Sequence, residues 1–410
     1  MATALLGDLP DAALRGTLVL VRLDLNVPLD GDRVLDDTRI DASLPTLHYL
    51  CERGARVVIA SHLGRPEGRD PRASLGPVAA RLAERLGRSV AFVPETVGEA
   101  ARATIDALGE GDLLLLENTR FEAGEVSNDD AFARELAGDA TLFVQDAFGS
   151  AHRAHASTEG AARVIRERGG LAVSGLLLAR ELKWLVSALE SPEPPFVLVM
   201  GGAKMTGKID VISAFLPRVD RLLIGGAMAN TFLVAQGREV GGSLFEPSRV
   251  DLARRLIEEA GETLLLPIDG RSATVPEGDL SRARPGRVIG RDERVPDGEE
   301  LLDIGPATVE RYSEVISTAR TIVWNGPMGV FEHPDFGEGS FGVARAIAAA
   351  TDAGAVSVVG GGESAAAAAA AGVEDRLTHI STGGGAALSL LAGEALPGVE
   401  VLSDATEVAG

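Results

Sequence analysis

The first half of the chain places polar and mostly cationic residues directly after short apolar segments. These segments resemble buried β-strands, and open parallel sheets bind ligands at the carboxyl ends of their strands. Arginine suits an anionic ligand because its planar fork binds carboxylate or phosphate oxygens in pairs. The set comprises Asp24 and Asn26 after Leu18–Leu23, His62 and Arg65 after Arg56–Ala60, Arg120 after Leu113–Leu116, Arg153 after Leu142–Val144, and Arg39 at the start of the helix that follows the first loop. We expect a pocket for a small anion bearing phosphate and carboxylate groups, in which the Asp and Asn side chains hold hydroxyl groups.

An ordinary surface role would explain any one of these arginines, but it does not explain a set in which each member follows a strand. His152 and His155 lie beside Arg153, and for them packing or helix capping is as good an interpretation as ligand binding. No His, Cys and Asp spacing suggests a zinc site. The lone Cys51 is interpreted as a reduced thiol on a helix.

The second half instead carries glycine clusters after its apolar segments. Glycine there lets backbone N–H groups approach phosphate oxygens, and a helix N-terminus favours anions. The clusters span residues 201–210, 225–232, 324–332, 360–364 and 381–391. Two of them open helices near Gly362 and Gly384, and we expect both helix starts to face one polyphosphate.

Four side chains in these clusters could complete a nucleotide site. The chain has only three lysines, and two of them, Lys204 and Lys208, lie four residues apart in one glycine-rich stretch. This spacing suggests that a compact ammonium group is required there to neutralise phosphate. Glu363 at a helix start could hold Mg²⁺, and Glu332 could accept hydrogen bonds from ribose hydroxyl groups.

The elements that would position these residues alternate regularly between strand and helix. The second half repeats the rhythm of the first with apolar segments at Val197–Met200, Arg221–Ile224, Thr263–Leu266, Thr321–Trp324 and Val356–Val359. Near-continuous apolar strands separated by helices are typical of parallel sheets covered on both faces. The sequence therefore predicts an α/β fold with two doubly wound, Rossmann-like domains. Residues 270–300 are polar and turn-rich, and we expect them to form a surface excursion.

A proline-rich stop marks the boundary between the two predicted domains. Residues 176–190 have a helical pattern, and the SPEPP segment at 191–195 cannot continue a helix. We expect an N-terminal anion-binding domain over residues 1–175, a hinge helix and linker over 176–195, a C-terminal nucleotide-binding domain over 196–385, and a tail over 386–410.

Composition excludes several other classes of protein. The formal net charge is −21, which argues against nonspecific binding to nucleic acid or anionic membranes. No apolar run reaches the roughly 18 residues of a membrane helix, and the N-terminus lacks a basic signal region. We therefore expect a cytoplasmic protein. There is no Walker loop, and no G-x-G-x-x-G turn of the kind that an NAD-dependent dehydrogenase would carry.

Nine segments, in order, resemble the signature segments of the phosphoglycerate kinase family. They are DLNVP, SHLGRP, ENTRF, DAFGSAHRAHAS, GGAKMTGKI, GGAMANTF, DIGP, VWNGPMGVFE and STGGGA, and the resemblance runs from about Thr17 to about Leu391. It implies reversible, Mg²⁺-dependent phosphoryl transfer between 1,3-bisphosphoglycerate with ADP and 3-phosphoglycerate with ATP, in glycolysis and gluconeogenesis. A hinge-bending monomer is expected, with a tail that packs on the N-terminal domain.

The resemblance also implies residue roles. Substrate binding is carried over to Asp24, Leu25, Asn26, Arg39, His62, Leu63, Gly64, Arg65, Arg120 and Arg153. Nucleotide binding is carried over to Lys204, Lys208, Gly225, Gly226, Asn325, Glu332, Gly361, Gly362, Glu363 and Ser364, with Glu363 as the metal ligand. Catalysis is carried over to Arg39, Lys204, Lys208, Gly361 and Gly384, which would meet the transferring group when the domains close.

Two positions depart from the family pattern. Gly207 stands where the family usually has Asp before the second lysine, and Glu363 stands where it has the metal-binding Asp. Glutamate keeps the carboxylate but is one methylene longer. These departures leave open an alternative function, a catalytically weakened paralogue that senses metabolites.

Overall fold

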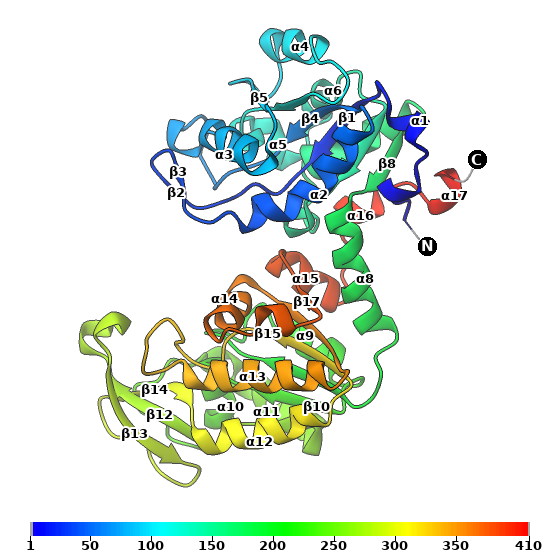
Figure 1. Ribbon diagram of the computed structural model, residues 1–410. Coiled ribbons are helices and arrows are strands. Elements are labelled where there is room, and N and C mark those ends of the chain that lie inside the picture. The colour runs from blue at the N-terminus through cyan, green and yellow to red at the C-terminus, as the bar shows by residue number, and fades with distance from the viewer. Residues whose placement is uncertain (1–2, 409–410) are drawn as a thin grey trace. The chain divides into compact units, whose positions relative to one another are not determined.

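The computed structural model describes residues 3–408, which divide into two compact units (Figure 1). The first unit contains the chain up to Lys183 together with the segment from Ala395 onward, and the second contains Trp184–Glu394. The division lies inside helix α8 (Leu176–Glu190). The chain returns to the first unit at Ala395, so helix α15 (Gly384–Leu391) belongs to the second unit rather than to the tail expected from residue 386.

The first unit is built on a six-stranded parallel sheet with the order β5-β6-β4-β1-β7-β8. Central strand β1 pairs in register with both neighbours, so that Leu20 lies opposite Val58 and Phe143. Strand order reverses at β1, which creates a crevice at its carboxyl end. The strands are β1 (Leu18–Arg22), β4 (Arg56–Ala60), β5 (Ala91–Phe92), β6 (Leu113–Leu115), β7 (Leu142–Gln145) and β8 (Leu171–Ser174).

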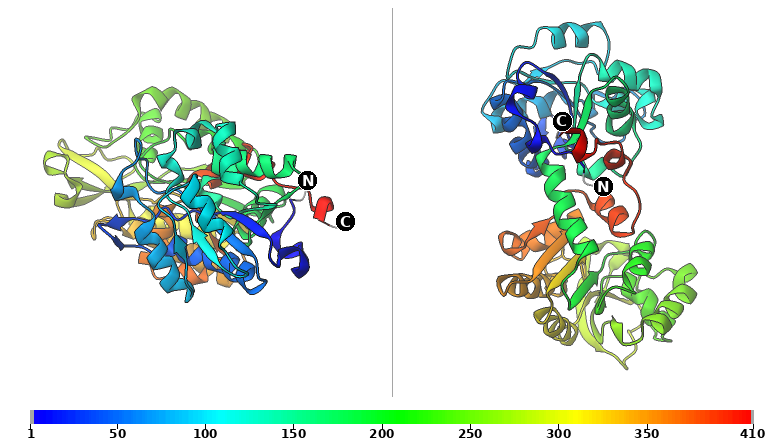
Figure 2. Two further views of the ribbon diagram at one scale, coloured as in Figure 1. Left: turned by 90° about the horizontal axis from the view of Figure 1, so that it is seen from above. Right: turned by 90° about the vertical axis from the view of Figure 1, so that its right-hand side faces the viewer.

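Helices cover both faces of this sheet (Figures 1 and 2). Helix α3 shows why they form: its buried residues Val78, Ala79, Leu82 and Leu86 recur on one helical face, and the helix ends at the left-handed Gly87. These helices are α2 (Thr38–Glu52), α3 (Gly76–Leu86), α4 (Glu99–Asp106), α5 (Ala123–Ser127), α6 (Asp130–Ala137) and α7 (Ala161–Glu167). Asn128 adopts φ 54°, a left-handed conformation that separates α5 from α6.

The second unit repeats the design with the parallel strand order β11-β10-β9-β15-β16-β17. Its reversal point is β9, which lies between β10 and β15. The strands are β9 (Phe196–Met200), β10 (Arg221–Ile224), β11 (Leu264–Leu265), β15 (Thr321–Asn325), β16 (Val356–Gly360) and β17 (His379–Ile380). The prediction of two doubly wound parallel-sheet domains is confirmed.

The helices of the second unit also lie on both faces of its sheet (Figure 2). The buried face of α13 packs around Val343, Ala344 and Ile347, which join Trp324 in the core of this unit. These helices are α9 (Ile209–Phe215), α10 (Met228–Ala235), α11 (Val250–Ala260), α12 (Pro306–Ser317), α13 (Glu338–Asp352), α14 (Gly362–Ala370) and α15.

The segment expected as a surface excursion forms a three-stranded antiparallel sheet. Strand β12 (Asp269–Thr274) pairs on one side with β13 (Arg284–Gly290) and on the other with β14 (Glu299–Ile304). The strands were not predicted, because most of β13 is exposed and its polar sequence shows no apolar pattern.

The C-terminal segment packs on the sheet of the first unit. Ser403 accepts a hydrogen bond from Ala4 N at 2.8 Å through its carbonyl oxygen and donates one to Ala172 O at 2.7 Å. The short helices α16 (Pro397–Glu400) and α17 (Ala405–Val408) belong to this segment. Across residues 3–408, no helix has the length and apolar character that crossing a bilayer requires.

Candidate active site

The predicted anion-binding residues follow the carboxyl ends of the neighbouring strands β6, β4, β1 and β7, around the reversal point of the first sheet. Arg39 donates to Asn26 O at 2.7 Å and lies 3.3 Å from a carboxylate oxygen of Asp24. Asp24 also accepts a hydrogen bond from Asn26 N at 3.2 Å. The Asn26 side chain in turn accepts one from Gly64 N at 2.8 Å. The loops after β1 and β4 and the first turn of α2 are therefore held together by their own polar groups.

Leu25 and Leu63, also predicted as ligand-binding positions, have buried side chains and act here through their backbones. Leu25 N donates to Ser61 Oγ at 2.9 Å, and Leu63 N donates to Asn118 Oδ1 at 3.2 Å. These contacts connect the same loops to the end of β6. Arg120 reaches the group from that side, because its guanidinium donates to Gly64 O.

The cations of this site lie close enough to perturb each other. Burial and the charges of Arg153 and Arg22 lower the pKa of Arg120 to about 10. Burial and the neighbouring guanidinium groups lower the pKa of His62 well below its usual range. Uncompensated positive charge of this kind favours an anionic ligand with several negative groups. His155 behaves similarly, since burial and Arg120 lower its pKa to about 4.

Arg65 and Arg153 complete the predicted set. Arg65 is exposed beyond Gly64, and its charge contributes to the lowered pKa of Arg120. Arg153 is partly buried and donates to His152 Nε2 at 3.1 Å. His152 thus supports an arginine rather than standing apart from the site.

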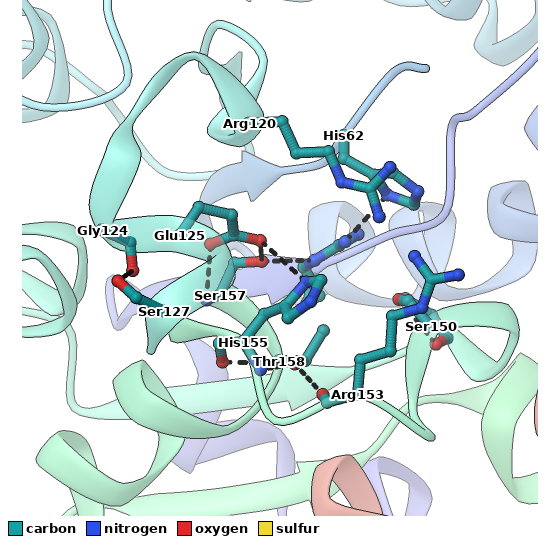
Figure 3. A network of polar contacts seen from close by, with 12 residues as sticks. His62, Arg120, Gly124, Glu125, Ser127, Ser150, Arg153, His155, Ser157 and Thr158 are labelled. Carbon is teal, nitrogen blue, oxygen red and sulfur yellow. Dashed lines mark hydrogen bonds and ion pairs between the residues drawn. The ribbon is translucent and has the colours of Figure 1, made fainter. Parts of the chain in front are cut away.

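Three residues of this site were missed by the sequence reasoning. Arg22 is 1% exposed at the end of β1 and hydrogen-bonds to His62 and to Ser157. Ser157 in turn donates to Glu125 (Figure 3). The sequence does indicate Arg22, because it is the one charged residue of the apolar segment Leu18–Leu23. A buried charge requires partners and marks a polar site inside the fold.

The second unit contains a cavity of about 330 Å³ beside the carboxyl ends of its strands. Much of its wall is apolar or backbone, and Leu244 and Leu280 keep 52% and 43% exposure. A large apolar surface beside glycine turns suits a flat aromatic base joined to a polar tail. The lining residues are Gly202, Ala203, Gly226, Ala227, Leu244, Val275, Gly278, Leu280, Glu300, Leu301, Leu302, Pro327, Gly329, Val330, Glu332 and Glu363.

Of the two predicted lysines, Lys208 is anchored and Lys204 is exposed. Lys208 Nζ donates to Gly201 O and lies 3.5 Å from Asn325 O, so its ammonium group sits among backbone carbonyls at the ends of β9 and β15. Burial lowers the pKa of Lys208 to about 8, and the Glu363 carboxylate opposes this shift. A phosphate ligand would strongly stabilise the charged form of an ammonium group that is buried in this way.

The loop that carries both lysines is held by a carboxylate from another segment. Glu246 accepts hydrogen bonds from the Thr206 backbone at 3.0 Å and from the Thr206 hydroxyl group. Gly207 follows with φ 86°, a conformation that glycine adopts readily and an aspartate would adopt under strain. The departure at this position therefore matches the backbone that the loop adopts.

Asn325, Ser364 and Gly225 have structural contacts in this unit. Asn325 Nδ2 donates to Gly360 O at 2.8 Å, and Ser364 Oγ accepts from Gly326 N at 2.6 Å. These two bonds join the turns after β15 and β16. Gly225 N donates to Met200 O at 2.8 Å, which fixes the turn after β10 beside β9.

The two predicted phosphate-binding helix starts lie side by side. A Cβ atom at Gly384, the first residue of α15, would lie 3.1 Å from the Gly361 Cα that precedes α14. Only glycine permits this approach without displacing the neighbouring turn. Gly361 and Gly362 therefore present backbone N–H groups next to those of a second helix, an arrangement that suits a polyphosphate.

A divalent metal ion fits the chemistry of this site. Among the described residues, no three His, Cys, Asp or Glu side chains gather as a metal site of their own. Mg²⁺ is commonly held by one or two carboxylates plus the phosphates of a substrate, and it does not need such a cluster. Glu363 is exposed, lines the cavity and acts electrostatically on Lys208. Glu332 is likewise exposed at the cavity wall.

Comparisons with known proteins match nearly the whole chain to one family. The sequence profile of the family described as phosphoglycerate kinase matches residues 9–394. A phosphoglycerate kinase of Rubrobacter xylanophilus is 51% identical over 400 residues, which cover 97% of this chain and 98% of the relative. The cytosolic phosphoglycerate kinase of Triticum aestivum is 47% identical over 403 residues, covering 97% and 98%.

Solved structures extend the similarity to three dimensions. Phosphoglycerate kinase from Coxiella burnetii superposes with a TM-score of 0.82 at 39% identity, covering 95% of this chain and 96% of that one. The enzyme from Pyrococcus horikoshii superposes with a TM-score of 0.84 at 32% identity, covering 99% of both chains. The chain belongs to the phosphoglycerate kinase family.

Proposed function

We propose that the cationic site of the first unit holds 3-phosphoglycerate in the reaction of this family, the reversible transfer of a phosphoryl group between ATP and the carboxyl group of that acid. Arg65, Arg120 and Arg153 would bind the phosphate of the substrate by charge-assisted hydrogen bonds. Asp24 and Asn26 would hold its hydroxyl group, and Arg39 and His62 would lie near the reacting carboxylate. The observation that carries this proposal is the cluster of cationic side chains at the carboxyl ends of the central strands, which is held together by the Arg22–His62, Arg120–Gly64 and Arg39–Asp24 contacts.

The glycine-lined cavity of the second unit is proposed as the nucleotide site. Its apolar wall would contact the base, and Glu332 would accept hydrogen bonds from the ribose. Lys204, Lys208 and the backbone N–H groups at Gly361 and Gly384 would contact the phosphates, with Gly226 and Gly362 shaping the pocket. Asn325 and Ser364 would act by holding the two turns in place.

Glu363 is proposed to hold Mg²⁺ with the nucleotide phosphates. When bound, Mg²⁺ would neutralise charge on the transferring group. Glu363 is the second residue of α14 and lies on the cavity wall, so its longer side chain can still reach a ligand there.

The proposed transfer needs no general base, because the attacking group is already a carboxylate at neutral pH. A bond forms from the carboxylate oxygen to the terminal phosphorus as the bond from that phosphorus to the ADP oxygen breaks. Catalysis then consists of alignment and stabilisation of charge by Arg39, Lys204 and Lys208. Each substrate has its own unit in this proposal, so we expect the units to move during turnover, with α8 and residues 191–195 as the hinge.

The cellular location, the oligomeric state and the sensor alternative remain to be considered. A close relative carries the name of a cytosolic enzyme, and we propose a cytoplasmic monomer that acts on small molecules. The sensor alternative rested on Gly207 and Glu363. Gly207 fits the φ of its loop and Glu363 keeps a carboxylate at the cavity, so neither observation favours loss of catalysis.

A coupled assay of the purified chain tests the function directly. We expect ATP- and Mg²⁺-dependent phosphorylation of 3-phosphoglycerate, and a fall of about 10- to 100-fold in kcat/KM in Arg39→Ala, as expected for lost hydrogen bonds to a charged group. Arg221→Ala, an exposed arginine at the start of β10, is the matched control. Absence of turnover in the parent protein, with both ligands bound, would support the sensor alternative.

The metal role of Glu363 predicts a shift in Mg²⁺ dependence. Glu363→Gln keeps the length of the side chain but removes its charge. We expect the Mg²⁺ concentration for half-maximal rate to rise about tenfold at saturating nucleotide, the scale of one charged contact. Glu338→Gln, which removes an exposed carboxylate at the start of α13, should leave it unchanged. An equal Mg²⁺ requirement in Glu363→Gln and the parent would exclude Glu363 as the ligand.

A further inference from the structure

A buried chain of hydrogen bonds runs from the interior of the first unit to His62 (Figure 3). The Glu125 carboxylate accepts hydrogen bonds from the Ser157 hydroxyl group at 2.6 Å and from Ser157 N at 3.0 Å. Ser157 Oγ accepts in turn from Arg22 Nε at 2.8 Å. Arg22 continues the chain, because its Nη2 lies 3.0 Å from His62 Nδ1. All four side chains are at least 96% buried: Arg22 is 1%, His62 4%, Glu125 0% and Ser157 1% exposed.

The chemistry of Arg22 fixes the proton on the His62 ring. A guanidinium group only donates hydrogen bonds, so the Nδ1 atom that faces it must accept. An accepting Nδ1 carries no proton, and the neutral ring then carries its proton on Nε2. The cations Arg22, Arg39, Arg120 and Arg153 surround the ring and, together with burial, oppose its protonation. His62 is thus a neutral ring with one N–H group, even though it lies in a cationic site.

The carboxylate of Glu125 supplies negative charge that stabilises the buried cations Arg22 and Arg120. Its carboxylate is completely buried and raises the pKa values of both Arg22 and Arg120 against the effect of burial. Its other basic neighbour, His155, lies 3.8 Å away and is neutral at pH 7 because burial lowers its pKa to about 4. Replacing the carboxylate with a neutral amide would remove the negative charge that acts most strongly on Arg22, and it would leave the Ser157 hydroxyl group only a weaker, uncharged acceptor.

We propose that Glu125 and Ser157 are positioning residues which, through Arg22, hold His62 as a neutral Nε2–H hydrogen-bond donor in the substrate site. The inference deepens the role given above to His62 and rests on that proposed function. A neutral donor can bind the carboxylate or hydroxyl oxygens of the acid without adding a further charge to the cationic site. Arg22 also has a specific role that the other cations of the site do not share. Its planar guanidinium group donates to Ser157, Leu23 O and His62 at once, and the compact ammonium group of a lysine could not span these three partners.

The state of the ring can be measured without any turnover. The chain has six histidines, so selective ¹⁵N labelling and two-bond ¹⁵N–¹H correlation spectra can assign His62 by comparison with His62→Gln. We expect the Nε2–H tautomer in the parent protein at pH 7. Glu125→Gln and Ser157→Ala should each give a mixture of tautomers, whereas Glu135→Gln and Ser127→Ala, at exposed positions of α6 and α5, should match the parent. An Nδ1–H ring in the parent, or a pure Nε2–H ring in both Glu125→Gln and Ser157→Ala, would overturn the proposal.

Kinetics then separate this inference from the proposed function. For Glu125→Gln we expect a KM for 3-phosphoglycerate about tenfold higher, on the scale of one hydrogen bond, with kcat and the KM for ATP within about twofold of the parent. Ser157→Ala should change KM in the same direction, and it serves as the second test if Glu125→Gln folds poorly. Altered tautomers with an unchanged KM would uphold the positioning by Glu125 but overturn the substrate role of His62. A fall in kcat with an unchanged KM would contradict both the positioning by Glu125 and the substrate role of His62.

Discussion

Lys208→Ala is expected to lower kcat by about 10²- to 10³-fold, the usual loss when one group that stabilises transition-state charge is removed. The ammonium group is held between Gly201 O and Asn325 O, where a phosphate would replace weak carbonyl contacts with a full negative charge. Lys208→Arg should not restore the rate, because a planar guanidinium cannot occupy the space of a compact ammonium group. Steady-state kinetics of both variants in the coupled assay measure the effect.

The pH dependence of the parent provides a second measurement on the same residue. Lys208 has a pKa of about 8 in the free protein, so it loses its charge as the pH rises through that value. Since kcat/KM reports the free enzyme, kcat/KM for ATP should fall above about pH 8, and this limb should be absent in Lys208→Ala. Arg218→Ala, at an exposed position of the same unit, is the control. A parent profile that stays flat up to pH 9 would contradict the assignment.

The parts of the fold that the sequence predicted are those in which burial and periodicity agree. Strands such as Phe196–Met200 are buried at every residue, and their apolar sequence shows it. Strand Arg284–Gly290 is mostly exposed and pairs with β12 through its backbone, so side-chain polarity gives no signal. The interruption between α5 and α6 at Asn128 gives no sequence signal for another reason, since one left-handed residue between two helical stretches leaves the apolar pattern almost unchanged.

The candidate site shows the same division between local and long-range information. Residues that follow strands could be placed at the sheet edge from chain order alone, and Arg39 and Asp24 do meet there. Glu125 could not be placed in this way, because it reaches Ser157 across 32 residues and from a five-residue helix with no sequence motif. The contact depends on how the loops after β6 and β7 fold over the sheet, which local patterns do not determine.

Asp146 links the loop after β7 to the start of helix α8, and its removal should have the largest effect on stability. Its buried carboxylate accepts hydrogen bonds from Leu177 N at 2.9 Å and from Leu178 N at 3.0 Å. Without it, two N–H groups in the first turn of α8 would be buried without an acceptor. The contact joins the loop that leads to Arg153 with the helix expected to act as the hinge.

The pKa of Asp146 determines whether its contribution to the free energy of unfolding rises or falls with pH. Burial raises the pKa to about 6, although hydrogen bonds from Thr46, Leu178 and Leu177 oppose the rise. The folded protein therefore binds a proton at a pH where the unfolded chain has released it. The contribution of this carboxylate to the free energy of unfolding consequently falls as the pH rises from about 4 to about 6.

For Asp146→Ala we expect a loss of about 2–3 kcal/mol in the free energy of unfolding at pH 7, from the two unpaired N–H groups. Asp146→Asn keeps an acceptor oxygen and should lose less than half as much. Asp146→Asn also lacks the titrating group, so the parent should gain stability relative to this variant as the pH falls from 6 to 4.

Urea unfolding followed by circular dichroism gives the free energies, and hydrogen exchange at residues 176–180 localises the change to the start of α8. Asp139→Ala, at an exposed position of the same unit, is the control. Equal unfolding free energies for the alanine variant and the parent, with unchanged exchange, would show that α8 starts without this cap.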